Sequence, residues 1–348
     1  MPLFCKLRAL PPLMRGTIIF LFAFTVVIIL FALACSVIGL SIPVALRTLF
    51  LTSFSTKFGF SETIHKTTVL CFTTLAFAIP FRIRQYNIGG SGQMMVGATA
   101  ATLVGLGLSG TGSLLPMFIL VPMMIIAAIV AGGVFASFAG ILKVKFNIDT
   151  VISTILLNFI AIQLMGYVCA TKPWRDPLQG NPTTLRLPDA ALLPRTLDVV
   201  FAAAVIVLIF LFINHSRLGY EIQSVGYNPK ASKEFGINSN RLTMLTYLVA
   251  GGIAGLAGAF EVMMIHKELK VGFHMTSGAE YGIFGILACL LCSGKVLGVP
   301  FAAFLVAVLL VGADALQRTL NVPSEIVFLV QALVVIILIG TRSKAEGA

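Results

Sequence analysis

The stretch Arg82–Gly97 reads RIRQYNIGGSGQMMVG, a glycine-rich polar segment between two apolar runs in a chain whose mean hydropathy is +1.01. In hydrocarbon, a lipid-exposed break in a helix would leave backbone N–H and C=O groups without hydrogen-bond partners. Such a segment is therefore expected only where protein buries it or where it borders a water-filled path. Its position predicts a membrane protein that moves a solute.

The composition around this segment is strongly apolar. Hydrophobic residues make up 58% of the chain and charged residues only 11%. A chain of this composition has more apolar surface than one soluble core could bury. Charges fall in gaps between apolar stretches of about 20 residues, the length of a membrane-crossing helix. We count roughly ten such stretches, at 16–40, 66–81, 86–108, 114–142, 147–170, 197–214, 243–264, 280–294, 297–318 and 325–341. Residues 41–60 are also fairly apolar and predict a re-entrant or short interfacial piece.

These stretches predict an all-α polytopic protein with about ten transmembrane helices, in which residues 1–348 form one transmembrane domain. Lys and Arg accumulate on the cytoplasmic side of membrane proteins. With the N terminus inside, the inner segments hold 14 Lys/Arg against 4 Asp/Glu, and the outer segments 10 against 9. We therefore expect both termini in the cytoplasm, and the net charge of +11 reflects orientation more than a nucleic-acid partner. The six cysteines lie in or beside apolar runs and indicate neither a disulfide framework nor a metal site.

Two long polar segments lie on opposite faces in this topology. Residues 171–196 hold five prolines and predict an outer, periplasmic or extracellular loop that could touch a soluble partner or serve as a passive connector. Residues 215–242 lie on the cytoplasmic face. There Asn228-Pro229 can start a short helix and Gly236 can end it. Such a helix would be a contact point for another protein, although a plain solvated loop is an equal reading of the segment taken alone.

Five short motifs resemble those of one known family. Residues 87–98 contain NIGGSGQ and GA, similar to the NIGxEGQ…GA signature of permeases of bacterial ABC importers for nucleosides and related ribose-like solutes. Residues 225–237 contain VGYNPKA and GI, similar to the family's VGxNPxAA…GI coupling segment. The other three are LNFIA at 157–161, AGLAGAFEV at 254–262, and PWRDP at 173–177, which resembles the outer loop of the longer nucleoside permease. They follow the family's order from about residue 66 to 340.

The resemblance implies a type II-like ABC importer permease in the bacterial inner (cytoplasmic) membrane. Its expected partners are a second homologous permease, separate ATPase subunits and an extracytoplasmic substrate-binding lipoprotein. The chain contains no G-x-x-x-x-G-K-[ST] phosphate loop, so it is not expected to be an enzyme itself. No cofactor is expected in this chain, since ATP and magnesium would bind the partner ATPase.

The motifs also supply candidate site residues. For the substrate pathway these are Asn87, Gly89, Gly90, Ser91, Gly92, Gln93 and Asn158. For coupling to the ATPase, the resemblance implies Gln223, Val225, Gly226, Tyr227, Asn228, Pro229, Lys230, Ala231, Glu234 and Gly236. Glycines permit close helix approach, and neutral amides offer hydrogen bonds without the cost of a charge. The first group could therefore contact solute or only pack helices.

Several alternatives stay open. The family usually has Glu where this chain has Ser91, which leaves the cargo undecided between a nucleoside, riboflavin and a simple sugar. A secondary carrier would need paired ionisable residues at mid-membrane, and a membrane enzyme would need an acidic metal cluster. Most acids of this chain lie near predicted helix ends, and Glu261 there predicts a gate or an ion pair. Asn158 and Gln163 lie five residues apart and so project from different faces of one helix.

Overall fold

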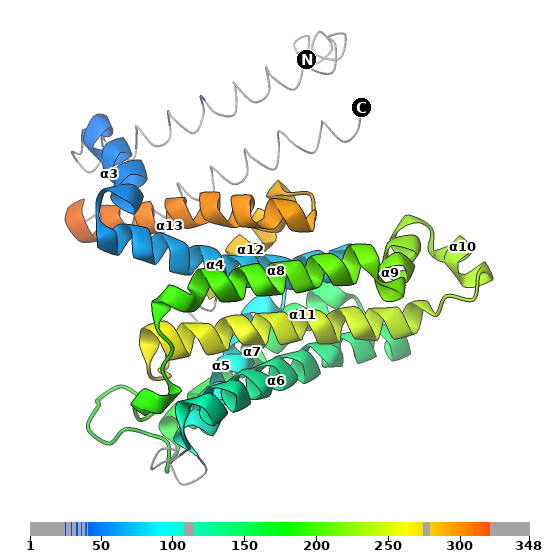
Figure 1. The fold of residues 1–348 in the computed structure, drawn as a ribbon, viewed down its shortest axis with the longest axis horizontal. Helices are drawn as coiled ribbons and strands as arrows, with labels where there is room; N and C mark the ends of the chain where they lie inside the picture. The colour runs from blue at the N-terminus through cyan, green and yellow to red at the C-terminus, as the bar shows by residue number, and fades with distance from the viewer. Residues whose placement is uncertain are drawn as a thin grey trace. The chain divides into compact units, whose positions relative to one another are not determined.

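The structure is a computed structural model that describes residues 41–107, 115–273 and 279–320, together with the isolated positions Thr25, Ile29, Leu33, Ser36 and Gly39 (Figure 1). Within these ranges the chain is helical, and its extended pairing is confined to two isolated bridges, Arg175 with Thr184 and Thr183 with Lys270. The predicted all-α class is confirmed. The predicted helix at 325–341 and nearly all of the one at 16–40 lie outside the described residues.

The other eight predicted stretches correspond to helices. These are α4 (Lys57–Phe81), α5 (Gly90–Leu106), α6 (Met117–Phe146), α7 (Thr150–Ala170), α8 (Asp198–His215), α11 (Ser239–Glu261), α12 (Ala279–Leu291) and α13 (Val299–Leu320). The apolar piece at 41–60 contains a further helix, α3 (Ile42–Ser55), and the polar segment 215–242 contains α9 (Arg217–Tyr227) and α10 (Pro229–Glu234). A π-helical turn, η3 (Val262–His266), continues α11.

Helix α4 begins earlier than its hydropathy predicts. The expected start was residue 66, but the helix starts at Lys57 and includes the polar residues Thr63, His65 and Lys66. All three are buried by the surrounding protein. A hydropathy pattern places a helix end at such residues, because it does not distinguish a polar group that faces water from one whose hydrogen bonds are made inside the protein.

Six of the described helical segments are long and apolar enough to cross a membrane: 57–81, 117–146, 150–170, 189–215, 239–266 and 296–320. Helices α3 and the apolar part of α12 are shorter, and α5 has 17 residues. The fold is therefore that of a multi-pass membrane protein, with the spans placed by length and composition.

The chain divides into two compact units, one of residues 1–64 with 304–348 and the other of residues 65–303. In the first unit, α3 packs on α13. Ser53 Oγ donates to the carbonyl of Val308 at 3.1 Å, and a Cβ added at Gly312 would collide with the carbonyl oxygen of Leu49. The absence of a side chain at Gly312 thus allows the two backbones to approach closely.

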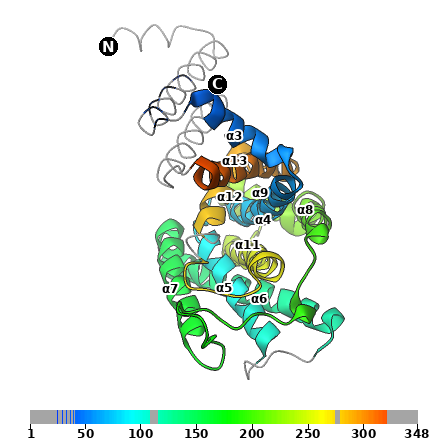
Figure 2. The same ribbon diagram turned by 90° about the vertical axis from the view of Figure 1, so that its left-hand side faces the viewer.

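The second unit is built around α11. Viewed end-on in Figure 2, α11 lies among α4, α5, α6 and α8. Phe260 of α11 contacts Phe72 of α4 and Phe201 of α8. On its other side α11 meets α5 and α6 backbone to backbone, because a Cβ at Gly97 would strike Gly255 and one at Gly132 would strike the Gly251 carbonyl. This glycine seam, made of Gly97, Gly132, Gly251 and Gly255, holds three helices together.

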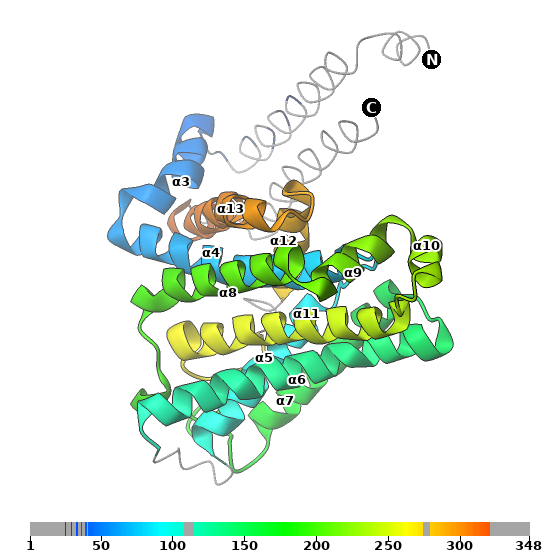
Figure 3. The same ribbon diagram turned by 45° about the vertical axis from the view of Figure 1, so that its right-hand side comes forward.

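The loops of the second unit gather at its two ends (Figure 3). One end carries the turn at 82–89, the loop at 147–149 and the pair α9–α10, and it is rich in Arg and Lys. The opposite end carries residues 171–197 and the segment after α11. The predicted cytoplasmic segments thus lie together, and the predicted outer loop lies at the far end.

Candidate functional site

The glycine-rich segment forms a turn and the first turns of α5, and its two amides bind each other. Asn87 Nδ2 donates to Gln93 Oε1 at 2.9 Å, and Gln93 Nε2 donates to Asn87 Oδ1 at 2.8 Å. Asn87 Nδ2 also lies 3.4 Å from the carbonyl of Ala76 in α4, and Asn87 Oδ1 accepts from the Gly89 N–H. Each side chain is 1% exposed. The polar groups of this pair are therefore satisfied inside the protein.

Asn158 ties the same segment to α7. Its Oδ1 accepts from the Gly92 N–H at 2.8 Å, and its Nδ2 donates to the Ile88 carbonyl at 3.1 Å. Thr154, one turn earlier, accepts from the Ile88 N–H. These bonds satisfy backbone groups of the turn and of the first residues of α5, which no helix bond can reach.

The small residues of the segment permit close helix approach. A Cβ at Gly92 would lie 2.6 Å from Asn158 Oδ1, and one at Gly282 of α12 would collide with Ser91 Oγ. Gly89 and Gly90 are buried beside them. The structure thus brings all seven pathway candidates into one cluster, in which Asn158 is partly buried and the other six are buried. Their contact with solute stays a prediction.

The pair α9–α10, in the segment predicted to be cytoplasmic, has well-defined helix ends. Asn228 caps α10 by accepting from the Ala231 N–H at 3.1 Å, Pro229 occupies the first turn, and Gly236 follows with φ of 76°. Asn is a favoured N-cap, Pro fits the first turn, and glycine adopts positive φ without strain. The short helix predicted at 229–235 is therefore present, with its expected start and end.

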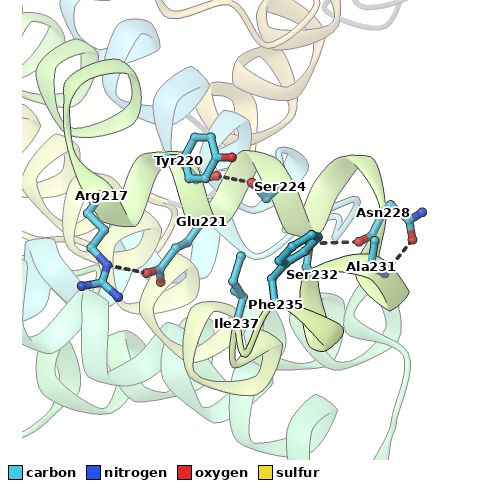
Figure 4. A pocket seen from close by; sticks show the side chains of 9 residues that line it. All are labelled: Arg217, Tyr220, Glu221, Ser224, Asn228, Ala231, Ser232, Phe235 and Ile237. Carbon is cyan, nitrogen blue, oxygen red and sulfur yellow. Dashed lines mark hydrogen bonds and ion pairs between the residues drawn. The ribbon is translucent and has the colours of Figure 1, made fainter.

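Between α9 and α10 lies a groove of about 450 Å³ (Figure 4). Arg217 and Glu221 pair across one turn of α9 at 3.0 Å, at one end of the groove. Tyr227 and Phe235 are 82% and 85% exposed, and Lys230 and Glu234 are also exposed. A surface that shows large aromatic rings to solvent is suited to contact another protein.

The remaining coupling candidates point inward. Val225 and Gly226 are buried, and Gln223 donates to the Ile213 carbonyl at 2.8 Å. A Cβ at Gly226 would collide with the Arg82 carbonyl oxygen. The candidate coupling segment thus rests directly on the turn that begins the glycine-rich segment, and this contact joins the two groups of candidates.

The far end carries an ordered cap. Backbone N–H groups of Thr184 and Leu187 donate to Leu269 and Lys267, each at 2.8 Å, and Trp174 Nε1 donates to Gly107. The loop at 171–196 therefore runs along the segment that follows α11. A segment fixed in this way presents a constant surface to solvent.

Beneath the cap lies a buried ionic cluster, defined as His65, Asp198, Glu261 and His266. His65 Nδ1 lies 3.1 Å from Asp198 Oδ2, and its Nε2 lies 2.9 Å from Glu261 Oε2. His266 Nε2 is 3.3 Å from the other Glu261 oxygen. As an imidazolium, His65 donates to both carboxylates. The cluster joins α4, the start of α8 and the end of α11, and Glu261 takes part in an ion pair as its position predicts.

Within residues 41–107, 115–273 and 279–320, no group of three His, Cys, Asp or Glu side chains has a geometry that could hold a metal ion. The ionic cluster is instead closed by its own hydrogen bonds.

Comparison with known proteins shows the family of the chain. The profile of a family described as "Branched-chain amino acid transport system / permease component" matches residues 59–339. The chain belongs to this permease family. It is therefore a multi-pass membrane permease component of an ABC transporter, and components of this kind are not themselves enzymes.

Individual relatives cover most of this permease. The guanosine ABC transporter permease protein NupP of Bacillus subtilis is 32% identical over 88% of each chain. The glucose ABC transporter permease protein TsgB13 of Haloferax volcanii is 29% identical over 84% of this chain and 79% of its own. The nucleoside ABC transporter permease protein NupB of Lactococcus lactis is 27% identical over 82% and 80%.

Sequence reasoning missed most of the ionic cluster of this permease. His65 lies 133 residues from Asp198 and 196 from Glu261, so no local spacing reveals them as partners. Their one available signal is that each interrupts or borders an apolar run, where ionisable residues are rare and usually functional.

Proposed function

We propose that this chain is the permease subunit of an ATP-driven importer that takes up a nucleoside, a flat ring joined to a ribose. The observation that carries the proposal is the exposed pair α9–α10 at the basic end of a membrane-embedded ABC permease. The cargo assignment is supported by two relatives that are named for guanosine and nucleosides.

In this proposal separate ATPase subunits dock on residues 215–242, with Tyr227, Lys230, Glu234 and Phe235 at the contact. ATP and magnesium bind those subunits. A movement of α9 is transmitted to the turn at Arg82 through the contact with Gly226. The contact has no room for a side chain that could change its conformation and absorb the movement. The coupling segment would thereby act on α4 and α5.

The remaining partners and the orientation follow the same scheme. A second homologous permease completes the transmembrane assembly as a heterodimer, and a substrate-binding lipoprotein docks on the ordered cap at the outer end. Both termini lie in the cytoplasm, and the complex resides in the bacterial inner membrane. The gathering of basic segments at one end of the second unit supports this orientation.

The test is uptake by the reconstituted complex. Proteoliposomes that contain this chain and its partner subunits should accumulate labelled guanosine or uridine only when ATP is supplied to the ATPase side. Uptake by this chain alone, without ATP, would overturn the proposal in favour of a secondary carrier.

A simple sugar is the second candidate cargo, favoured by the glucose permease relative. Competition separates the two. Excess unlabelled nucleoside should suppress uptake, whereas suppression by glucose and not by nucleoside would assign the sugar. Riboflavin, which carries both a flat ring and a polyol, serves as a third competitor.

A further inference from the structure

Helix α7 exposes a polar side chain well inside a segment long and apolar enough to span a membrane. Gln163 lies 13 residues after Thr150 and seven before Ala170, the two ends of the helix. At about 1.5 Å per residue this position is about 10 Å from the nearer helix end. Gln163 is exposed and makes no hydrogen bond within the described part of the chain.

Gln163 stands apart from the other exposed positions of the spans. Among the described residues, it is the exposed polar side chain farthest from either end of its helix. The exposed residues near the middle of α6 and α8 are all apolar: Met123, Ile126, Ile129, Val130, Val134, Phe138, Ala203, Ala204, Val207 and Leu208. Those two faces suit lipid.

A free amide does not suit lipid. Moving an unpaired amide from water to hydrocarbon costs roughly 4–8 kcal/mol, so natural spans turn such groups toward protein or water. In the second unit α7 packs on α5 and α6 through its other face, and it lies at the edge of the unit in Figure 2. The exposed residues beside it, Leu156, Ile160 and Leu164, are apolar, so Gln163 is the position on the outward face of α7 that needs a polar neighbour.

Two aromatic residues share the stripe with Gln163. Phe159 and Tyr167 lie four residues before and after it, which is about one helical turn each way. They are 62% and 67% exposed. The stripe thus presents an aromatic ring, an amide and a second ring in sequence along the axis of α7.

This combination has a definite chemical preference. Aromatic rings stack on flat ring systems, and a free amide both donates and accepts hydrogen bonds. Asn158, on the adjoining face, has its donor and acceptor engaged with Ile88 and Gly92. Gln163 is therefore the amide of α7 that remains available to a solute.

We infer that Phe159, Gln163 and Tyr167 form a solute-contacting stripe that borders the translocation path. The stripe takes a flat heteroaromatic ring between or against its aromatic side chains, and Gln163 hydrogen-bonds the polar edge or hydroxyls of the same solute. This inference rests on the proposed import of a nucleoside and assigns the binding surface to α7.

Thiol labelling tests whether the stripe borders water. The six native cysteines are replaced by serine or alanine, and Gln163→Cys and the control Phe138→Cys are made in that background within the full transport complex. A charged, membrane-impermeant thiol reagent reacts in water, where the thiolate forms. We expect labelling of Gln163→Cys that slows with excess nucleoside, and no labelling of Phe138→Cys. An unlabelled Gln163→Cys in a complex that transports would overturn the inference.

Transport kinetics test recognition by the stripe. Gln163→Leu should lower uptake roughly tenfold by raising KM, as expected for one lost hydrogen bond, while the subunits still co-purify. Gln163→Asn should recover part of the loss, and Phe138→Leu should behave as the parent does. Unchanged KM in Gln163→Leu would refute the stripe even though ATP-driven uptake holds. Absence of ATP-driven uptake in the parent complex would refute the proposed function instead.

Discussion

His65 and Glu261, separated by 196 residues in sequence, meet in a buried contact of 2.9 Å between Nε2 and Oε2. The glutamate is 2% exposed and the histidine is fully enclosed. Because Asp198 and His266 extend the contact on either side, the start of α8 and the end of α11 are tied to α4 by charge as well as by apolar packing. Removing Glu261 would take away the carboxylate that His65 Nε2 and His266 Nε2 share, and would leave Asp198 as the partner of His65.

Glu261→Ala should therefore destabilise the permease strongly. Loss of one partner from a buried ion pair typically costs about 3–5 kcal/mol, which should appear as a clear fall in the Tm of the purified complex. Glu268→Ala is the matched control, since Glu268 is partly exposed and lies 3.4 Å from Gln179. Equal Tm values for the two variants would show that the ionic cluster adds nothing to stability.

The amide pair Asn87–Gln93 should behave as one unit. Asn87→Ala leaves Gln93 buried without its donor, at a cost of about 1–3 kcal/mol, and Gln93→Leu does the same to Asn87. The double variant should cost less than the sum of the two single changes, because the second change removes a group already unpaired. Thermal unfolding and uptake are measured together in all four proteins. Additive losses in Tm would contradict the reciprocal bonds, and lost uptake at unchanged Tm would indicate contact with solute.

Two glycines of the coupling segment should respond differently to substitution. Gly226→Ala places a methyl group against the Arg82 carbonyl, so we expect uptake per ATP hydrolysed to fall severalfold. Gly236 has φ of 76° with open space around it, so Gly236→Asn should be tolerated, since Asn accepts positive φ better than most residues. The ratio of uptake to ATP hydrolysis in proteoliposomes measures both. A normal ratio of uptake to ATP hydrolysis in Gly226→Ala would show that movement is not transmitted through the contact with Arg82.

The stability of α10 should depend on the side chain of its N-cap residue, Asn228. Asn228→Ala removes the acceptor for the Ala231 N–H and should weaken the short helix by about 1 kcal/mol. Asn228→Asp keeps a good cap and is the control. ATPase subunits should co-purify less well with the alanine variant than with the aspartate variant, and identical recovery would mean that the helix forms only when bound.

The helices, including the short α10, could be predicted from the sequence because their signals are local. Apolar length marks α6, α7 and α8, and Asn228, Pro229 and Gly236 mark both ends of α10. The start of α4 could not be predicted, because Thr63 and His65 are polar residues that the fold buries.

The candidate site was predictable only in part, for the same reason. The motif identified Asn87 and Gln93 as polar candidates in the same segment. Their hydrogen bonds to each other depend on the geometry of the turn between them, which the sequence alone does not reveal. The spacing between Asn158 and Gln163 predicted that they lie on different faces of α7. The exposure of Gln163, however, depends on which face α5 and α6 cover. Such properties arise from contacts between distant parts of the chain.

The glycine seam between α5, α6 and α11 limits how the permease can move. Helices that slide past one another do so by small rotamer changes of the side chains between them. At Gly97, Gly132 and Gly255 an added Cβ would meet only backbone, and at Gly251 the one neighbouring side chain is the methyl group of Ala136, so there is no rotamer to readjust. These three helices are accordingly expected to rotate as a single rigid body, with the hinges of the transport cycle located at its borders.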